Sequence, residues 1–359
     1  MSLATQDAAT GFLPLRVLTV DRLTDDSVAV ELARPLDGSF AFAPGQHLTL
    51  RRVVDGVDVR RTYSLCTSAG SGRLRIAVKQ IEGGAFSTWV VDSLRAGDVV
   101  EVLPPAGRFG PVLDPAAAHR YVCFAAGSGI TPMASIVASV LETEPQSTVA
   151  LVFGNRTSRD VMLLEELADL KDSHPGRFEL LHVLSREEQD AELLTGRIDG
   201  DRVRRLLATL LPPEGVDGWF VCGPFAMVTG VRDTLVAAGV DPSRVHVELF
   251  HAEPPPPRAR VATAGSRNST TVHALLHGRA TTVQVGRAGD SVLDAVLAAR
   301  ADAPYACKSG VCGTCRARVV EGAVEMDVNY ALEPDELTAG IVLTCQSHPT
   351  TDVVRLEFG

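Results

Sequence analysis

Residues 306–315 read ACKSGVCGTC and place Cys307, Cys312 and Cys315 on one short stretch. Their C-x4-C-x2-C spacing is one with which proteins hold a [2Fe–2S] cluster, and such a cluster needs one more, distant thiolate. Cys345, in the sequence LTCQS, can supply it. The sequence therefore predicts a [2Fe–2S] cluster bound by these four cysteines.

The glycines of this stretch, Gly310 and Gly313, allow the backbone to fold tightly and to point N–H groups at the sulfurs. A structural zinc site is the main alternative, but such sites usually use two C-x2–4-C pairs, and only one pair is present here. The chain has seven cysteines in all, an odd number, and its first residues, MSLATQDAATGFLPL, do not resemble a secretory signal. We therefore expect reduced cysteines and a cytoplasmic protein, not a disulfide scaffold.

Length, composition and charge limit the classes of protein to which this chain can belong. With 359 residues the chain is long enough for two or three domains, and with 45% hydrophobic and 22% charged residues it is typical of globular proteins. Its formal net charge of -10 argues against a nucleic-acid partner. Residues 121–141 carry no charge, but Gly127, Gly129 and Pro132 interrupt them, which favours a buried strand, a turn and a helix over a membrane span.

Two patterns of secondary structure follow each other along the chain. Short β-rich runs separated by glycine and proline predict an antiparallel β-barrel over residues 1–113, with strands at 15–20, 27–32, 47–50, 74–81 and 99–103. Alternating strands and helices then predict a parallel α/β domain over residues 114–250, with strands at 121–126, 149–153, 178–184 and 218–222 and helices at 131–141, 161–170, 203–211 and 224–238.

The last part of the chain is set apart by composition. Residues 251–270 contain four prolines followed by Gly, Ser, Asn and Thr, and are expected to form a linker. Residues 271–359 predict strands at 272–276 and 280–285, a helix at 291–300 and the cysteine-rich stretch. This segment resembles a plant-type ferredoxin, which implies a β-grasp fold.

Residues 60–65 read RRTYSL and resemble the R-x-Y-S motif of the ferredoxin-NADP reductase family. The resemblance implies that Tyr63 packs against a flavin ring, that Ser64 contacts that ring and that Arg61 neutralises the flavin phosphate. On its own, a Tyr-Ser pair in a strand is as typical of ordinary packing.

Gly83, Gly84 and Ser87 follow a predicted strand and precede a predicted helix. Free N–H groups at the start of a helix suit a phosphate. In the family, this G-G-x-x-S segment holds the flavin pyrophosphate, which implies FAD, although the FMN of phthalate-dioxygenase-type reductases is left open. The alternative is a plain turn in which Ser87 caps the helix. The sequence PPAGRFG also matches the family, where Arg108, Phe109 and Gly110 close the barrel.

A second glycine-rich turn lies between the uncharged strand and its helix. It reads GSGITP and resembles the G-x-G-x-x-P turn with which the family approaches a nucleotide pyrophosphate; the residues concerned are Gly127, Gly129, Thr131 and Pro132. Cys222, Gly223 and Pro224 form a C-G-P turn after a later strand, and in the family this cysteine lies beside the nicotinamide. A lone cysteine is otherwise a small core residue.

The choice of nucleotide is expected to depend on arginines. Ser185 and Arg186 follow a predicted strand and resemble the S-R pair of NADPH-specific members, and Arg156 is expected to add to the same pocket. Arginine pairs with a 2′-phosphate, which a carboxylate would repel. The alternative is a solvated surface arginine. Glu248 and Phe250 resemble the E-x-F with which members approach the flavin, although their alternation also suits a half-buried strand.

The order of parts resembles the reductase components of multicomponent oxygenases. This implies transfer of electrons from NADPH through FAD and the cluster to an oxygenase. The distinctive stretch NYALEPDEL, residues 329–337, most resembles the reductases of phenylacetyl-CoA epoxidase, a bacterial diiron oxygenase of aromatic degradation. Reductases of other ring-hydroxylating dioxygenases or of steroid hydroxylases share the module order. An iron-sulfur redox sensor is the alternative from another class.

Overall fold

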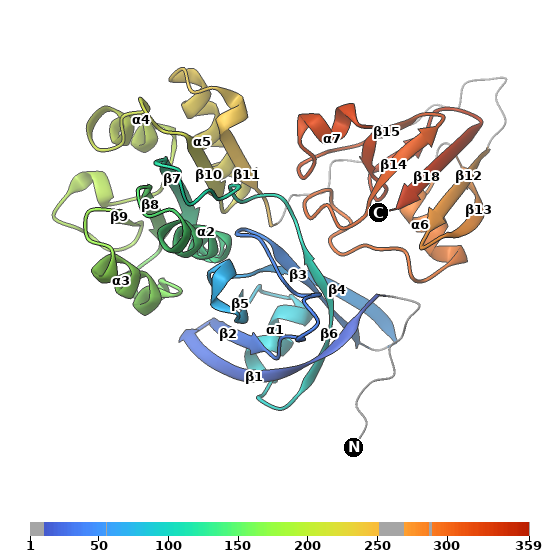
Figure 1. The fold of residues 1–359 in the computed structure, drawn as a ribbon, viewed down its shortest axis with the longest axis horizontal. Helices are drawn as coiled ribbons and strands as arrows, with labels where there is room; N and C mark the ends of the chain where they lie inside the picture. Colours follow the sequence, from blue (N-terminus) through green and yellow to red (C-terminus); the bar gives the residue numbers. More distant parts are fainter. Residues whose placement is uncertain (1–10, 55, 251–268, 287–288, 359) are drawn as a thin grey trace. The chain divides into compact units, whose positions relative to one another are not determined.

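A computed structural model describes residues 11–54, 56–250, 269–286 and 289–358 (Figure 1). These residues form two compact units. The larger unit is built mostly from residues 14–250 and the smaller mostly from residues after 268. The expected linker, 251–270, lies outside the described residues except for its last two positions, which begin the first strand of the smaller unit.

The first part of the larger unit is an antiparallel sheet of six strands in the order β4-β3-β6-β1-β2-β5. A bridge between Leu65, just after β4, and Ile76 of β5 joins the two ends of this order, so the sheet closes into the predicted barrel. The elements are β1 (Leu13–Thr24), β2 (Ser27–Leu32), β3 (His47–Val54), β4 (Val57–Ser64), β5 (Leu74–Lys79), α1 (Ala85–Asp92) and β6 (Val99–Ala106).

The second part is a parallel sheet in the order β11-β10-β7-β8-β9, and its paired strands all run in the same direction. Its central strands are buried along most of their length, which explains their continuous apolar sequence. The elements are β7 (Arg120–Ala126), α2 (Ile130–Thr143), β8 (Thr148–Asn155), α3 (Leu164–Ser173), β9 (Phe178–Leu184), α4 (Gly200–Thr209), β10 (Gly218–Cys222), α5 (Phe225–Ala237) and β11 (Val245–Glu248).

Two helices of this domain begin three residues away from their predicted starts: α4 begins at Gly200 instead of residue 203, and α3 begins at Leu164 instead of residue 161. The sequence predicts a helix over 161–170, but α3 begins only at Leu164 because Leu163 adopts a left-handed backbone conformation with φ of 55°. Val161, Met162 and Leu163 are buried in the core beneath α2 and α3. Their apolar pattern therefore reflects a buried loop and not a helical face.

The smaller unit contains a mixed sheet in the order β13-β12-β18-β14-β16, in which β12 and β18 run parallel and their other neighbours are antiparallel. Helix α6 packs into the core of this sheet, and β15 pairs with β17. The elements are β12 (Ser269–Leu276), β13 (Arg279–Gly286), α6 (Val292–Ala299), β14 (Arg316–Glu321), β15 (Val324–Met326), α7 (Pro334–Thr338), β16 (Ile341–Leu343), β17 (Ser347–Pro349) and β18 (Val353–Phe358). The predicted three-domain fold is confirmed.

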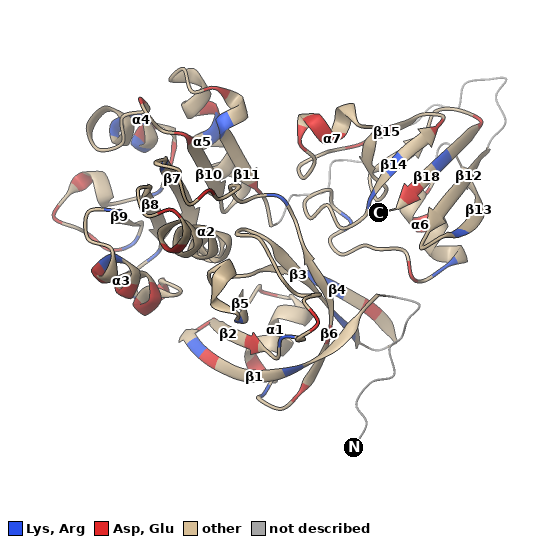
Figure 2. Cartoon of the chain, in the orientation of Figure 1, with Lys and Arg blue, Asp and Glu red and all other residues tan. Residues whose placement is uncertain are grey.

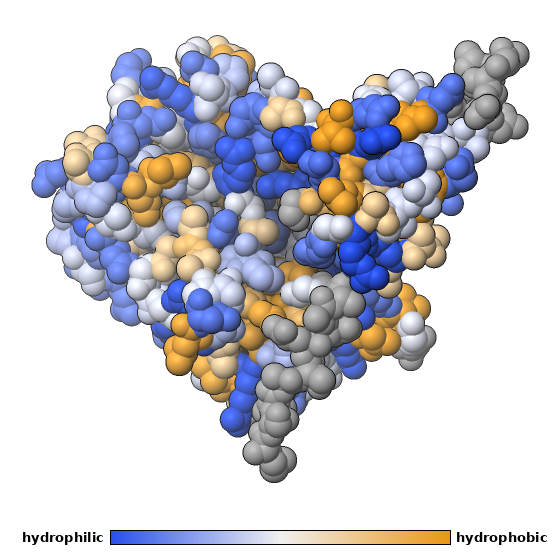
Figure 3. Space-filling view, turned by 45° about the vertical axis from the view of Figure 1, so that its right-hand side comes forward, coloured by the Kyte–Doolittle hydropathy of each residue, from blue (hydrophilic) through white to orange (hydrophobic). Residues whose placement is uncertain are grey.

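Acidic and basic residues are distributed over both units (Figure 2). On the face drawn in Figure 3, hydrophilic residues divide the hydrophobic surface into separate patches. Among the helices of the described residues, none has the length and apolar character needed to cross a membrane.

Candidate functional site

The carboxyl ends of the parallel strands meet at one edge of their sheet. The strand order reverses between β7 and β10, because the chain proceeds from β7 to β8 and β9 and then returns to the other side of β7. Open α/β sheets bind ligands at such a reversal. A cavity of about 570 Å³ lies at this edge, lined by Lys79, Ala126, Gly127, Gly154, Asn155, Arg156, Asp160, Ser185, Gly196, Arg197, Ile198, Asp199, Gly200, Pro224, Ala226, Met227 and Gly230.

Four residues predicted from the sequence line this cavity: Gly127, Arg156, Ser185 and Pro224. Two further predicted glycines shape it without lining it. A side chain at Gly129 would overlap the carbonyl of Cys222, and one at Gly223 would come within 2.7 Å of Met227. The turn at Gly129 therefore packs directly against the backbone of Cys222 and Gly223 because Gly129 lacks a Cβ.

Thr131 and Pro132 are buried in the first turn of α2, and the Thr131 hydroxyl donates a hydrogen bond of 3.1 Å to the carbonyl of Ser128. This bond connects the first turn of α2 to the glycine-rich turn and stabilises that turn. The two residues thus support the turn, and neither is among those that line the cavity.

Arg186 and Arg156 differ in their relation to the cavity. Arg186 is exposed and follows the cavity-lining Ser185, but it does not line the cavity itself. Its backbone N–H donates a hydrogen bond of 2.8 Å to the carbonyl of Arg156. Arg156 lines the cavity and forms an ion pair of 2.5 Å with Asp160. The role of Arg186 in reading a 2′-phosphate stays a prediction.

Sequence patterns did not indicate Arg197, which lines the cavity from a loop between β9 and α4. Arg202 holds this loop by donating hydrogen bonds to the carbonyls of Glu192, Leu193, Thr195 and Arg197. Gly196 adopts φ of 115°, which favours glycine. Charged residues in a short loop are common, so only the placement of Arg197 beside the cavity distinguishes it.

Ser64, Cys222 and Glu248 come together although three separate segments carry them. Cys222 and Glu248 are register partners in the parallel strands β10 and β11. The Ser64 hydroxyl, at the end of β4, donates a hydrogen bond of 3.3 Å to Glu248 Oε2. Burial raises the pKa of Glu248 to about 8, an effect that this bond partly opposes. Burial also raises the pKa of the Cys222 thiol, so both side chains are protonated at neutral pH.

Phe250 follows Glu248 by two residues, just beyond the end of β11, and is 40% exposed. An exposed ring at this position is free to meet a ligand, but exposure alone does not assign one. Its approach to the flavin therefore stays a prediction.

Tyr63 and Phe86 connect the two predicted flavin motifs. Their ring centroids are 5.9 Å apart, which places β4 against α1. Phe86 packs edge-on against Trp89, and the Arg52 guanidinium lies 4.4 Å from the Trp89 ring centroid. Arg61 lies on β4 two residues before Tyr63 and is exposed.

The turn before α1 depends on Gly83, Gly84 and Ser87. Gly83 adopts φ of 71°, and a side chain at Gly84 would come within 2.7 Å of Ser87 Oγ. The Ser87 hydroxyl accepts a hydrogen bond from the Ile81 N–H and donates one to the Gly84 carbonyl. Helix α1 begins at Ala85 with Gly84 as its N-cap, so the alternative of Ser87 as the cap is wrong. Ser87 instead closes the turn.

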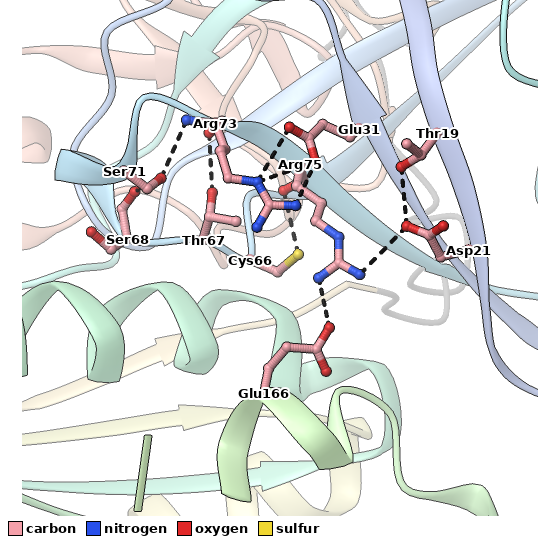
Figure 4. A network of polar contacts seen from close by, with 10 residues as sticks. All are labelled: Thr19, Asp21, Glu31, Cys66, Thr67, Ser68, Ser71, Arg73, Arg75 and Glu166. Atoms are coloured by element: carbon pink, nitrogen blue, oxygen red, sulfur yellow. Dashed lines mark hydrogen bonds and ion pairs between the residues drawn. The ribbon is translucent and has the colours of Figure 1, made fainter. Parts of the chain in front are cut away.

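An ion pair connects the barrel to α3 of the α/β domain (Figure 4). Arg75 of β5, whose side chain is 9% exposed, forms an ion pair of 2.7 Å with Glu166 of α3 and lies 3.9 Å from Asp21. The Arg75 carbonyl accepts a hydrogen bond from the Cys66 thiol. Cys66 and Cys123 are buried, and burial raises the pKa of each thiol to about 12.

The cysteine-rich stretch forms a tight turn in the smaller unit. Lys308, Gly310 and Gly313 have φ of 55°, 79° and 66°. The Ser309 N–H donates to Cys307 Sγ over 3.4 Å, and the Thr314 N–H donates to Cys312 Sγ over 3.5 Å. The backbone therefore points N–H groups at sulfur, as predicted.

The four cysteines lie in two neighbouring pairs. The side chain of Cys312 lowers the pKa of the Cys307 thiol to about 5, and the side chain of Cys315 lowers the pKa of the Cys345 thiol. Among the described residues, no three His, Cys, Asp or Glu side chains are arranged to hold a single metal ion. Two pairs are the arrangement that suits a two-iron cluster, in which each iron takes two thiolates.

Comparisons with known families agree with these three domains. Residues 14–110 match the family described as "Oxidoreductase FAD-binding domain", and residues 124–233 match "Oxidoreductase NAD-binding domain". Residues 275–350 match "2Fe-2S iron-sulfur cluster binding domain". The predicted FAD, nicotinamide nucleotide and [2Fe–2S] cluster are confirmed.

Similar proteins cover nearly the whole chain. It is 43% identical over 97% of its length to a component protein of "1,2-phenylacetyl-CoA epoxidase" from Escherichia coli (strain K12), covering 98% of that protein. It is 35% identical to the "3-ketosteroid-9-alpha-monooxygenase, ferredoxin reductase component" of Rhodococcus rhodochrous, covering 96% of each chain. The structure of phthalate dioxygenase reductase matches with a TM-score of 0.59 and 24% identity over 97% of this chain and 98% of that chain, which shows a shared fold.

Proposed function

Because the chain belongs to the ferredoxin-NADP reductase-like family whose members carry FAD-binding, NAD-binding and C-terminal [2Fe–2S] domains, we propose that it delivers electrons from NADPH to the diiron oxygenase of phenylacetyl-CoA epoxidation. Its general activity is that of an NAD(P)H-dependent oxidoreductase, the reductase component of an oxygenase. The proposal of this oxygenase as the electron acceptor is supported above all by the 43% identity to the Escherichia coli protein over 97% of this chain.

Bound FAD and a [2Fe–2S] cluster supply the conversion of a two-electron hydride donor into single electrons. The residues of the chain hold and orient the reactants. Gly127 and the start of α2 offer backbone N–H groups to a nucleotide pyrophosphate. Cys307, Cys312, Cys315 and Cys345 are proposed as the cluster ligands, which require a reducing compartment such as the cytoplasm.

Ser64 and Glu248 are proposed to hold a proton near the flavin and to transfer it. Glu248 is a protonated carboxyl at neutral pH, because burial raises its pKa to about 8. Its hydrogen bond with Ser64 connects it to the end of β4, next to Tyr63. For the Glu248 proton to pass toward the flavin ring, this hydrogen bond would reverse: the Glu248 carboxyl would donate its proton to Ser64 Oγ while the Ser64 hydroxyl gives up its own proton toward the ring.

The proposed preference for NADPH over NADH rests on arginines at the edge of the parallel sheet. Arg156 and Arg197 line the cavity and Arg186 lies beside it, so their guanidinium groups are available to an adenosine 2′-phosphate. Among these, Arg156 already has acidic partners, Asp160 and Asp26. Arg186 and Arg197 are therefore the stronger candidates for discrimination.

A second acceptor is supported by the 35% identity to the reductase component of 3-ketosteroid-9-alpha-monooxygenase. Reconstitution of electron transfer with each oxygenase distinguishes the two candidate acceptors. The chain, with its FAD and iron content verified, is mixed with NADPH, oxygen and either the epoxidase oxygenase with phenylacetyl-CoA or the ketosteroid oxygenase with its steroid. We expect NADPH-dependent epoxide formation and little steroid hydroxylation.

Steroid hydroxylation without epoxide would overturn the proposed acceptor. If neither oxygenase turns over while an artificial one-electron acceptor is reduced by NADPH, the acceptor is another oxygenase and the general reductase activity stands.

A further inference from the structure

Two of the cations that line the nucleotide cavity share one carboxylate. Lys79, at the end of β5, and Arg156, after β8, both line the cavity. Lys79 Nζ lies 2.9 Å from Asp26 Oδ1, and Arg156 Nη2 lies 3.5 Å from Asp26 Oδ2. Asp26 thus forms ion pairs with one cation from the barrel and one from the α/β domain.

Asp26 is held in place by its own turn. It lies between β1 and β2, and its Oδ1 accepts a hydrogen bond of 2.8 Å from the Thr24 hydroxyl. Its carbonyl accepts a hydrogen bond of 2.7 Å from the Gln80 N–H, next to Lys79. Burial alone would raise the pKa of Asp26, but hydrogen bonds from Lys79 and Thr24 and the charges of Lys79 and Arg156 hold it below its ordinary value. The side chain is therefore a carboxylate at neutral pH.

A carboxylate and a phosphate use the same kind of oxygen to accept hydrogen bonds from ammonium and guanidinium groups. A phosphate that enters the cavity toward Lys79 and Arg156 meets cations whose charges Asp26 and Asp160 already balance, and it is repelled by Asp26. We propose that Asp26 competes with a phosphate group of the nicotinamide nucleotide for Lys79 and Arg156, and thereby limits the affinity for the nucleotide. This proposal rests on the nucleotide site of the proposed function.

The competing interpretation has the opposite sign. If Asp26 only orients Lys79 and Arg156 for the phosphate, removal of its charge weakens binding. If Asp26 competes, removal of its charge strengthens binding and slows release of the oxidised nucleotide, a step that limits turnover in many enzymes. The direction of a single change in affinity therefore decides between them.

The test is Asp26→Asn in the full chain with its cofactors bound, which removes the charge and keeps the shape of the side chain. Asp25→Asn is the matched control, because Asp25 is the exposed neighbour in the same turn and contacts Arg22 through its backbone carbonyl, which the change leaves in place. The dissociation constants of NADP+ and NAD+ are measured by titration calorimetry. For Asp26→Asn we expect dissociation constants about threefold to fivefold lower, the size of one partly exposed ion pair, and for Asp25→Asn no change.

Comparison of NADP+ with NAD+ shows which phosphate group of the nucleotide competes with Asp26. Tighter binding of both NADP+ and NAD+ assigns the competition to the pyrophosphate, and tighter binding of NADP+ alone assigns it to the 2′-phosphate. Both results support the proposal. In a Lys79→Gln background, Asp26→Asn should increase the nucleotide affinity by a smaller factor, because one of the two cations that Asp26 and the phosphate compete for is absent.

Unchanged or weaker binding by Asp26→Asn relative to Asp25→Asn overturns the proposal. Asp26→Ser is a second variant that must shift the dissociation constants in the same direction, and thermal unfolding checks that the turn stays folded. Absence of binding in the parent chain would instead contradict the nucleotide site itself. The oxygenase takes no part in these measurements, so the result is independent of the acceptor.

Discussion

Ser64 and Glu248 are 184 positions apart in the chain, yet the Ser64 hydroxyl donates a hydrogen bond of 3.3 Å to Glu248 Oε2. This bond connects the barrel strand β4 to β11, an edge strand of the parallel sheet. Cys222 is the register partner of Glu248, so the bond brings a predicted flavin motif and a predicted nucleotide motif to the same place.

The first prediction concerns the protonation of Glu248. Burial raises its pKa from 4.5 to about 8, so between these values the folded protein holds a proton that the unfolded chain releases. Stability should therefore fall as pH rises through this window. We expect the Tm of the parent protein to decrease between about pH 5 and pH 8 more steeply than that of Glu248→Gln. Glu179→Gln, an exposed change in β9, should follow the parent.

A second prediction addresses the packing of the two nucleotide turns. In Gly129→Ala the new methyl group overlaps the carbonyl of Cys222, so we expect a loss of about 1–3 kcal/mol in the free energy of unfolding, together with weaker nucleotide binding. Gly230→Ala, in α5, meets no atom within 4 Å and should raise stability by about 0.5–1 kcal/mol. Denaturant unfolding measures both, and equal effects would contradict the close approach of the turns.

Nucleotide preference is expected to depend on Arg186 and Arg197. Arg186→Glu and Arg197→Glu should each weaken the binding of NADPH more than the binding of NADH. The expected difference is on the order of 1.5–3 kcal/mol, the size of a lost charge-assisted hydrogen bond. The ratio of kcat/KM for the two nucleotides measures this. Arg232→Glu, an exposed change on α5, is the control. Equal losses for both nucleotides would mean that the residue concerned does not read the 2′-phosphate.

For the cluster, we expect Cys312→Ser to lose or alter the iron-sulfur absorbance because one of four thiolates is gone. Reduction of ferricyanide by NADPH, which the flavin can support directly, should largely persist, whereas electron delivery to an oxygenase should collapse. Cys66→Ser, a buried cysteine of the larger unit that packs in the same core as α2, should bind as much iron as the parent. Full oxygenase activity in Cys312→Ser would remove the cluster from the electron path.

The last prediction tests the contact between the barrel and α3. Glu166→Gln removes the partner of the nearly buried Arg75 guanidinium and leaves Asp21 at 3.9 Å. Because Glu166 is partly exposed, we expect a loss of only about 0.5–1 kcal/mol in the free energy of unfolding. Glu165→Gln, the exposed neighbour on α3, should be within error of the parent. A larger effect from Glu165 would contradict the assignment of this ion pair.

Features encoded in short stretches of sequence were predictable. The spacing of Cys307, Cys312 and Cys315 indicated the cluster, and the uncharged run before Gly127 indicated a buried strand followed by a turn. Predicted strands such as Phe178–Leu184 and Gly218–Cys222 match their observed bounds, since apolar periodicity is a local property. The same local reasoning failed at Leu163, where a buried loop has the apolar pattern of a helix.

By itself, the sequence indicated the order of the domains and the [2Fe–2S] cluster, because cysteine spacing and apolar period act over a few residues, and the resemblance of its short motifs to the ferredoxin-NADP reductase family implied the flavin and the nicotinamide nucleotide. Only the tertiary structure decided which distant side chains meet. The closure of the barrel, the order of the parallel strands and the contact between the two domains place Asp26 against Lys79 and Arg156, Ser64 against Glu248, and Arg197 beside the cavity. These contacts depend on long-range packing, in which strand order and not sequence distance sets which residues are neighbours.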